Sequence, residues 1–242
     1  RKASRCPDCP NPLRQWLMAV ALAALSLSAR AAPGDIDTRF GDGGRVASGG
    51  SAIPLPNGGL AVGRNWVYGF EVEFLDAQGR PNPGLGSGGR TVVTLPPAPK
   101  SYFGRHQLRM PDGSLVFAGW VPDGNGSGAK TVHALLRLTP RGDVDPAFGT
   151  AGNGIAQLGS TSVIVGLAPQ ADGRLLVALL DGTLEGDEMG VSCVSATYRI
   201  SRLLRDGSVD PGYGVDGMLA VPDLASADCL APTLFATDAT GA

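Results

Sequence analysis

A segment near the middle of this 242-residue chain, DVDPAFGTAGNG at positions 143–154, has three looser copies elsewhere in the sequence. Each copy follows a glycine, at positions 34, 79, 142 and 207, so the copies are 45, 63 and 65 residues apart. Shared residues stand three, six, seven and ten positions after that glycine: Asp37, Asn82, Asp145 and Asp210; Phe40, Leu85, Phe148 and Tyr213; Gly41, Gly86, Gly149 and Gly214; Gly44, Gly89, Gly152 and Gly217. Such agreement is beyond chance even with 36 glycines, and the period is typical of repeat architectures.

A second set of turns lies between these segments. The sequences LPNGGLAVG, MPDGSLVFAG and QADGRLLVAL surround Gly58, Gly113 and Gly173, and a looser TDATGA surrounds Gly241. An Asn-Gly or Asp-Gly pair before an apolar run is a strong hairpin signal, because a type I′ turn needs positive φ at both central residues. These turns predict antiparallel strands joined by type I′ turns.

Each repeat therefore has room for four strands. One follows the repeated segment (45–48, 90–95, 154–158 and 217–221), two flank the Asp-Gly turn, and the last ends at the next segment's first glycine. We predict an all-β chain of tandem four-stranded, β-propeller-like blades, with about three full units and partial ones, in an open or truncated propeller. The predicted units lie near 34–79, 80–142, 143–207 and 208–242, the last one partial.

The shared residues of the repeated segment have structural roles in this arrangement. The Asp or Asn can accept hydrogen bonds from backbone amides two residues later, which fixes an Asx turn. The aromatic residue packs between units, and the glycines allow positive φ or close approach. No nucleophile or base is repeated, so the segment is predicted to connect one blade to the next.

These motifs resemble those of a known family. DIDTRFGDGGRV, DVDPAFGTAGNGIAQL and SVDPGYGVDGMLAV, alternating with PDGSLVFAG and ADGRLLVAL, resemble the delta-60 repeat family. The resemblance implies a bacterial, often exported protein whose repeats are thought to form a β-propeller, and it implies no defined activity. The first unit departs from the pattern at Leu85, where an aromatic residue is usual.

The N-terminus has the three regions of a secretory signal peptide. Basic residues precede an apolar run at positions 16–29, and Ala29-Arg30-Ala31 offers a cleavage site. We predict that residues 1–31 form a signal-peptide helix and that residues 32–242 are exported to the periplasm, the extracellular space or the cell surface. The alternative is a buried helix or a membrane anchor.

Removal of residues 1–31 changes the charge of the chain. It takes away five of 20 basic and one of 22 acidic residues, which leaves 15 against 21 and a net charge of −6. Nucleic acids and anionic membranes attract clustered positive charge. Neither a nucleic-acid partner nor membrane insertion of the mature chain is expected.

Four cysteines fall into two pairs. Cys6 and Cys9 lie within the predicted signal peptide, while Cys193 and Cys229 remain in the mature chain. Since disulfides persist in oxidising compartments, we predict a Cys193–Cys229 bond, with two buried thiols as the alternative.

A polar segment at 122–131 contains a candidate calcium site. Asp123, Asn125 and Ser127 place three oxygen side chains at alternate positions, as in the first half of an EF-hand loop. The twelfth position is Ala134, so the bidentate Glu is missing, and a polar connecting loop is the alternative. Apart from this calcium, no cofactor is expected.

Three further groups of residues are candidates for chemistry or recognition. Paired carboxylates in an acidic segment could serve a glycosidase, two histidines could serve a catalytic relay, and three aromatic residues could bind carbohydrate. These groups are Asp181, Glu185, Asp187 and Glu188; His106 and His133; and Trp66, Trp120 and Tyr198. A solvated loop, strand-face positions and core packing are the respective alternatives.

The sequence favours a secreted or cell-surface binding or scaffold module that has no identifiable catalytic site. A surface protein or a glycan is the expected partner, and an open arc would permit self-association. The alternative is an exported propeller hydrolase or lyase that acts on polysaccharide from a site on one rim.

Overall fold

The computed structural model describes residues 36–47, 50–66, 69–95, 101–123, 130–159, 162–187 and 190–221. These residues form three antiparallel four-stranded sheets and contain no helix, which confirms the all-β prediction. The first sheet contains β1 (Ser51–Pro54), β2 (Leu60–Trp66), β3 (Gly69–Leu75) and β4 (Arg90–Thr94). The second contains β5 (Tyr102–Arg109), β6 (Leu115–Asp123), β7 (Lys130–Leu138) and β8 (Ile155–Gly159). The third contains β9 (Ser162–Pro169), β10 (Leu175–Asp187), β11 (Gly190–Leu203) and β12 (Met218–Val221).

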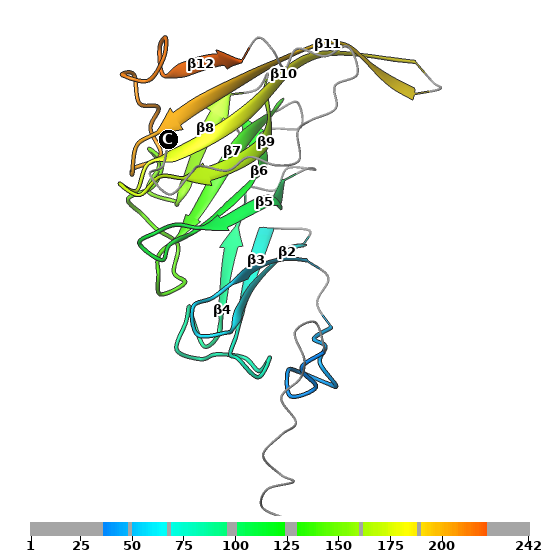
Figure 1. The fold of residues 1–242 in the computed structure, drawn as a ribbon, viewed down its shortest axis with the longest axis vertical. Coiled ribbons are helices and arrows are strands. Elements are labelled where there is room, and N and C mark those ends of the chain that lie inside the picture. Colours follow the sequence, from blue (N-terminus) through cyan, green and yellow to red (C-terminus); the bar gives the residue numbers. More distant parts are fainter. Residues whose placement is uncertain are drawn as a thin grey trace, which may run out of the picture.

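The three sheets follow one another along the long axis of the molecule (Figure 1). In each sheet the strands lie in chain order, so every pairing joins consecutive strands. The first strands of successive sheets are neighbours, because β5 contacts β1 and β9 contacts β5. No helix of the described residues is long and apolar enough to cross a membrane.

The grouping of strands differs from the sequence prediction. The strand after each repeated segment was expected to begin a new blade, but β4 pairs with β3, β8 with β7 and β12 with β11. Backbone hydrogen bonds fold the segment back on its own sheet: Phe74 N donates to Gly89 O and Asn82 N donates to Phe74 O, both at 2.8 Å. The segment, which we call the connector, therefore joins the third and fourth strands of one sheet instead of two blades.

The Asp-Gly turns also differ from the prediction. Gly58, Gly113 and Gly173 have φ of +79°, +92° and +84°, whereas the preceding Asn or Asp residues do not have positive φ. Gly58 N donates to Leu55 O at 3.1 Å, and Leu55 N donates to Gly59 O at 2.9 Å. This is the pattern of a type I turn followed by a left-handed glycine bulge, and not of a type I′ turn. Pro56, whose ring holds φ near −65°, suits the second position of a type I turn and is incompatible with type I′.

One connector contains two extra residues. Arg137 N donates to Gly154 O at 2.9 Å, as Phe74 N does to Gly89 O and Arg202 N does to Gly217 O. Gly154, and not the sequence-aligned Gly152, is thus the equivalent of Gly89 and Gly217. The extra residues lengthen the exposed part of the turn and leave its base unchanged.

Two apolar cores hold the three sheets together. Between the first two sheets, the Phe70 ring lies 5.6 Å from Phe103 and 5.1 Å from Phe117, and all three side chains are fully buried. Between the second and third sheets, Val116, Leu135 and Val177 belong to the other core. Burying a large apolar side chain stabilises a fold by about 1.5–3 kcal/mol, so face-to-face packing supplies most of the attraction between sheets.

Candidate functional site

The four connectors share one local hydrogen bond. In each, the Asp or Asn side chain accepts a hydrogen bond from the amide two residues later, at 3.0–3.1 Å. The acceptors are Asp37, Asn82, Asp145 and Asp210. This Asx turn explains why only Asp or Asn occurs at the position.

Each of the first three connectors also binds the following turn. Gly41 N donates to Gln78 O at 2.8 Å, Gly86 N donates to Arg141 O at 2.7 Å, and Gly149 N donates to Asp206 O at 2.8 Å. Each acceptor directly precedes the glycine that begins the next connector. The repeated glycines therefore link neighbouring repeats through the backbone.

An Arg–Asp–aromatic set reinforces the connector of the second sheet. Arg137 forms an ion pair with Asp145 at 2.6 Å, and its guanidinium carbon lies 4.6 Å from the Phe148 ring centre. Arg137 also donates to the carbonyl oxygen of Arg205, in the next sheet. The third sheet repeats the set, with Arg202 2.8 Å from Asp210 and 4.6 Å from the Tyr213 ring centre.

The first sheet replaces all three members of this set. Phe74 stands at the Arg position, Asn82 at the Asp position and Leu85 at the aromatic position. The Phe74 ring packs against Gly142, where an added Cβ would meet it at 2.5 Å. Phe148 packs against Gly207 in the same way, between the second and third sheets. Phe74 thus supplies from β3 the ring that Leu85 lacks. The signal in the sequence is the correlated change of all three positions between repeats, and the connector by itself contains only two of them.

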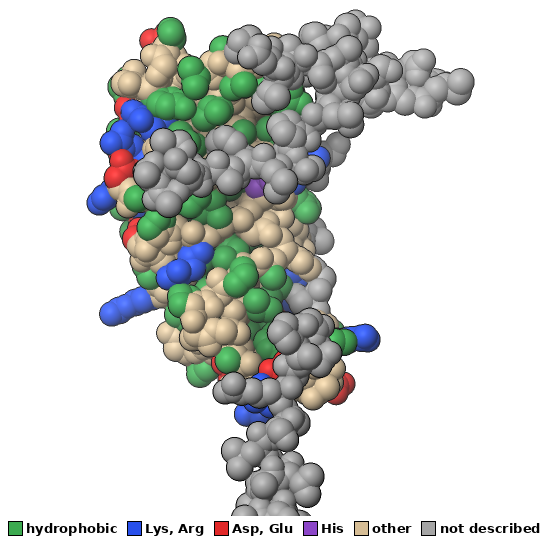
Figure 2. All heavy atoms as spheres, in the orientation of Figure 1, with side chains coloured by type: hydrophobic (Ala, Val, Ile, Leu, Met, Phe, Trp, Pro, Cys, Tyr) green, Lys and Arg blue, Asp and Glu red, His purple; other side chains and the backbone are tan. Residues whose placement is uncertain are grey.

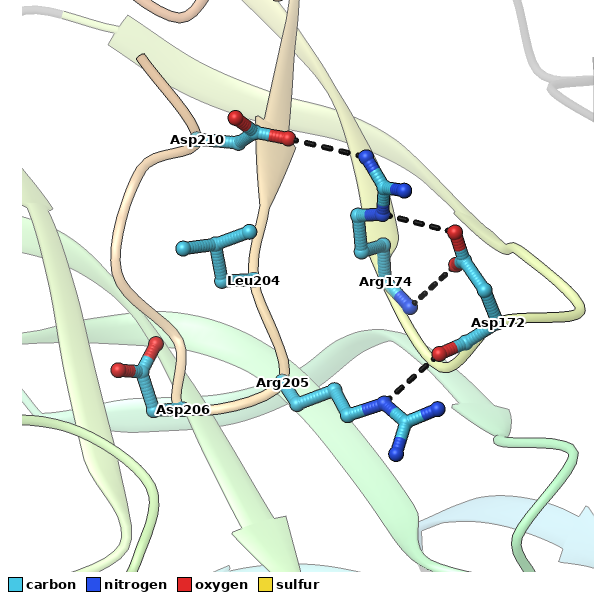
Figure 3. Close-up of a pocket in the computed structure, with 6 residues that line it drawn as sticks. All are labelled: Asp172, Arg174, Leu204, Arg205, Asp206 and Asp210. Atoms are coloured by element: carbon cyan, nitrogen blue, oxygen red, sulfur yellow. Dashed lines mark hydrogen bonds and ion pairs between the residues drawn. The ribbon is translucent and has the colours of Figure 1, made fainter. Parts of the chain in front are cut away.

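A polar pocket opens at the connector end of the third sheet (Figure 3). Its volume is about 690 Å³, and the side chains that line it come from the β9–β10 turn, the turn that follows β11 and the fourth connector. The lining residues are Asp172, Arg174, Leu204, Arg205, Asp206 and Asp210. Among them, sequence analysis had selected only Asp210.

Arg174 lies at the centre of this pocket. It contacts Asp172 at 2.7 Å and Asp210 at 3.2 Å, while Arg205 Nε donates to the Asp172 carbonyl at 2.7 Å (Figure 3). Three carboxylates face two guanidinium groups, so the lining has a net charge of −1. Such a lining can exchange hydrogen bonds with polar ligand groups and offers no net attraction to an anion.

The carboxylates of the pocket are ionised at neutral pH. The Arg174 backbone amide and side chain lower the pKa of Asp172, and hydrogen bonds from Ser208 lower that of Asp206. Burial opposes ionisation of Asp210, yet the Gly212 amide and Arg202 outweigh it and lower its pKa. The pocket therefore keeps its charged, hydrogen-bonding form well below pH 7.

The two predicted histidines lie on one face of the second sheet. His106 pairs with Ala118 and His133 with Trp120, and this is the face that packs on the third sheet. Burial lowers the pKa of both histidines, with Arg105 adding to the effect. Both side chains are therefore neutral at pH 7.

The predicted aromatic trio does not form one surface. Trp66 is 47% exposed, whereas Tyr198 is buried. Trp120 instead stacks on Tyr102, with ring centres 4.7 Å apart and planes 16° apart. This Tyr102–Trp120 pair joins residues that the sequence analysis did not connect.

The other predicted sites are described only in part. Asp181 forms an ion pair with Arg199, and the backbones of Glu185, Asp187 and Cys193 belong to the β10–β11 hairpin. Asn125, Ser127, Glu188, Cys229 and residues 1–31 lie outside the described residues, so the calcium site, the disulfide and the signal peptide stay predictions. Among the described residues, no group of three or more His, Cys, Asp or Glu side chains is placed to hold a metal ion.

Comparisons with protein-family models, with curated proteins and with solved structures found no match to this chain.

Proposed function

We propose that the three sheets are blades of a β-propeller-like arc and that the chain is an exported binding or scaffold module. The contact of β5 with both β1 and β9 supports this arrangement, since the first strands of propeller blades gather around one axis. The resemblance of the connectors to delta-60 repeats and the signal-like N-terminus are consistent with it.

The observation that carries the proposal is that some polar residues support the repeated fold, whereas others occur only at the pocket. The repeated Asp145 and Asp210 hold Asx turns and bind Arg137 and Arg202, so their role is architectural. The pocket of the third sheet combines Asp172 and Asp210, which the second sheet also has as Asp112 and Asp145, with residues that vary between repeats. The varying residues Arg174, Arg205 and Asp206 correspond to Ser114, Pro140 and Arg141 of the second sheet.

The pocket's chemistry favours a neutral polyhydroxyl ligand. Alternating carboxylates and guanidinium groups offer both acceptors and donors, and the lining has no excess of positive charge that would attract an anionic ligand. Charged side chains gather on this edge of the molecule, beside the turns and connectors (Figure 2). We therefore assign the pocket to a neutral glycan, held as part of a cell-surface or secreted assembly.

Binding of residues 32–242 to an array of neutral and acidic glycans tests this function. Arg174→Gln should weaken binding to the captured neutral glycan by about tenfold or more, the effect of losing one charge-assisted hydrogen bond. Arg90→Gln, a change of the same type on the exposed β4, is the matched control and should bind normally. Absence of glycan binding, or equal binding by the two variants, would refute the assignment. Release of reducing ends from a polysaccharide would favour the hydrolase alternative instead.

A further inference from the structure

One face of the third sheet carries apolar residues at the positions through which the first two sheets contact their neighbours. We call the face of each sheet that looks toward the next sheet its front face. Counted from the turn and connector glycines, the front faces carry apolar residues at matching positions. Ala61 and Val72 of the first sheet match Val116 and Leu135 of the second, and all four are buried at sheet–sheet contacts. The matching residues of the third sheet are Leu176 and Ile200.

An apolar cluster lies on this third front face. Val165, Ala178 and Tyr198 are at most 9% exposed, and Val163, Leu180 and Val221 pack against them. Every member comes from β9–β12, whereas the two other clusters combine residues of different sheets. Among the described residues, no second sheet thus contributes to the cluster.

The fourth strand shows where the neighbour should lie. Thr91 and Ala156 are 9% and 4% exposed, and each lies beside the glycine that begins the next connector: Thr91 Oγ1 donates to Gly142 O, and Ala156 lies under Gly207. Their equivalent, Leu219, is 46% exposed. Val209 and Val215 of the same connector are also exposed, at 40% and 78%.

The backbone amide of Gly214, in the fourth connector, has the same conformation as the amides that bind the following turn. Gly214 has φ of +61°, close to the +58° of Gly41 and the +56° of Gly86, whose amides bind the following turn. Within the described part of the chain, no carbonyl accepts from Gly214 N. The fourth connector therefore has the geometry of the other three and lacks their partner.

The opposite end of the molecule is not complementary to this face. The back of the first sheet carries Arg64, which contacts Glu71 at 3.3 Å and Glu73 at 3.2 Å, and Arg90, which contacts Glu71. Packing this network on the apolar front of the third sheet of a second copy would desolvate charged groups at a cost of several kcal/mol. A polar outer face is instead the usual end of a repeat array. Head-to-tail stacking of copies is therefore disfavoured.

A segment of this chain matches the missing element. Residues 230–237, LAPTLFAT, precede the turn-like segment around Gly241, as β5 and β9 precede the turns around Gly113 and Gly173. It is β5 that packs on β1, β2 and β3 of the first sheet, and β9 that contacts β5 and β7 of the second. In this alignment Phe235 corresponds to Leu167, which packs in the core between the second and third sheets, and to Ala52 and Gln107 of the first two sheets.

We propose that residues 230–237 dock as a strand on the front face of the third sheet and begin a fourth unit there. Phe235 enters the cluster of Val165, Ala178 and Tyr198. The proposal rests on the repeated contacts alone and does not depend on glycan binding.

Hydrogen exchange of residues 32–242, read by mass spectrometry, tests this docking. Phe235→Asp should speed exchange in residues 230–237 and in β12 by at least about tenfold, because a buried Phe contributes more than the 1.4 kcal/mol that a tenfold change requires. Thr237→Asp introduces the same charge at the position of the exposed Pro54 and Arg109 and should leave exchange within about twofold.

The remaining outcomes overturn the proposal. Equal exchange in the two variants would show that Phe235 is not docked. Complete exchange of residues 230–237 in the unmodified chain within seconds would show that no strand forms. Protection that appears only as protein concentration rises, together with a dimer in light scattering, would assign the face to a second copy.

Discussion

The Arg137–Asp145–Phe148 set permits a strict test, because the first sheet contains a natural replacement for it. Arg137 and Asp145 have side chains only 12% and 14% exposed, and Arg137 also holds the Arg205 carbonyl. Arg137→Phe leaves Asp145 without its cation and drives a ring toward the space that Phe148 fills beneath Gly207. Breaking a largely buried, hydrogen-bonded ion pair costs about 3 kcal/mol, roughly a hundredfold in the unfolding equilibrium constant.

A compensating variant places the residues of the first sheet at the equivalent positions of the second. Arg137→Phe combined with Asp145→Asn and Phe148→Leu reproduces Phe74, Asn82 and Leu85 in the second sheet. The Asn can keep the Asx turn without an unpaired charge, and the Leu makes room for the new ring. We expect the triple variant to recover to within about 1 kcal/mol of the unmodified chain, as coupled neighbouring residues do in double-mutant cycles.

Urea unfolding of residues 32–242, followed by circular dichroism, gives the free energy of unfolding for each variant. Arg202→Phe in the third sheet is the comparison. It should cost less, because the Arg202 side chain is more exposed than that of Arg137, at 20% against 12%, and because Asp210 keeps its ion pair with Arg174 at 3.2 Å. A triple variant as unstable as Arg137→Phe would refute the exchange of roles between Phe74 and Phe148. A loss below about 0.5 kcal/mol for Arg137→Phe would refute its structural importance.

Further predictions concern the free energy of unfolding and the melting temperature. Gly142→Ala should cost about 3 kcal/mol, because its Cβ would meet Phe74 at 2.5 Å and Gly86 N at 2.9 Å. Gly152→Ala has open space around its Cβ and should cost only the roughly 1 kcal/mol of a left-handed Ala. Equal costs for the two variants would contradict the close approach at Gly142. Asn65→Asp should cost about 2 kcal/mol, since the Asn65 amide donates to Phe103 O at 2.6 Å and accepts from Phe103 N at 2.7 Å. Asn153 only accepts a hydrogen bond, from Ile155 N, so Asn153→Asp should leave stability unchanged. An Asn65→Asp variant of unchanged stability would show that this link between sheets is dispensable. Burial lowers the pKa of His106 and His133 below the unfolded value near 6.5, so their contribution to stability is complete above that pH and is lost as the pH falls. The double variant His106→Gln, His133→Gln should therefore show a weaker dependence of the melting temperature on pH between about pH 6.5 and 5. An unchanged dependence would contradict this. Hydrogen bonds from Ser114 lower the pKa of Asp112 although burial opposes them, and the pKa of Asp210 is also lowered, so a second loss of stability should begin below about pH 4 in both proteins.

Several features could be predicted because they depend on residues close together in the chain. The Asx turn at Asp145 joins residues two positions apart, and the hairpin around Gly113 joins strands separated by one short turn. A left-handed glycine or an Asp acceptor is required there whatever the rest of the fold does. The all-β class and four strands per repeat follow from these local requirements.

Other features could not be read from the same signals. The pairing of β4 with β3 depends on the connector folding back, so the four-strand units had the right number of strands in the wrong grouping. The turns show a similar limit, since an Asn-Gly or Asp-Gly pair is compatible with two turn types, and the same type I turn forms with Pro56 and with Ala171 before the pair.

What the sequence determined by itself was the repeat, its turns and the residues that close them, because short-range hydrogen bonds act within a few residues. The tertiary structure sets which surfaces meet: Asn65 with Phe103, Phe74 beneath Gly142, and Arg174 with Asp210. These partners come from different strands or sheets, and their contact depends on how complete faces pack. Side-chain volume and burial choose among such arrangements, and neither quantity exists before the sheets come together.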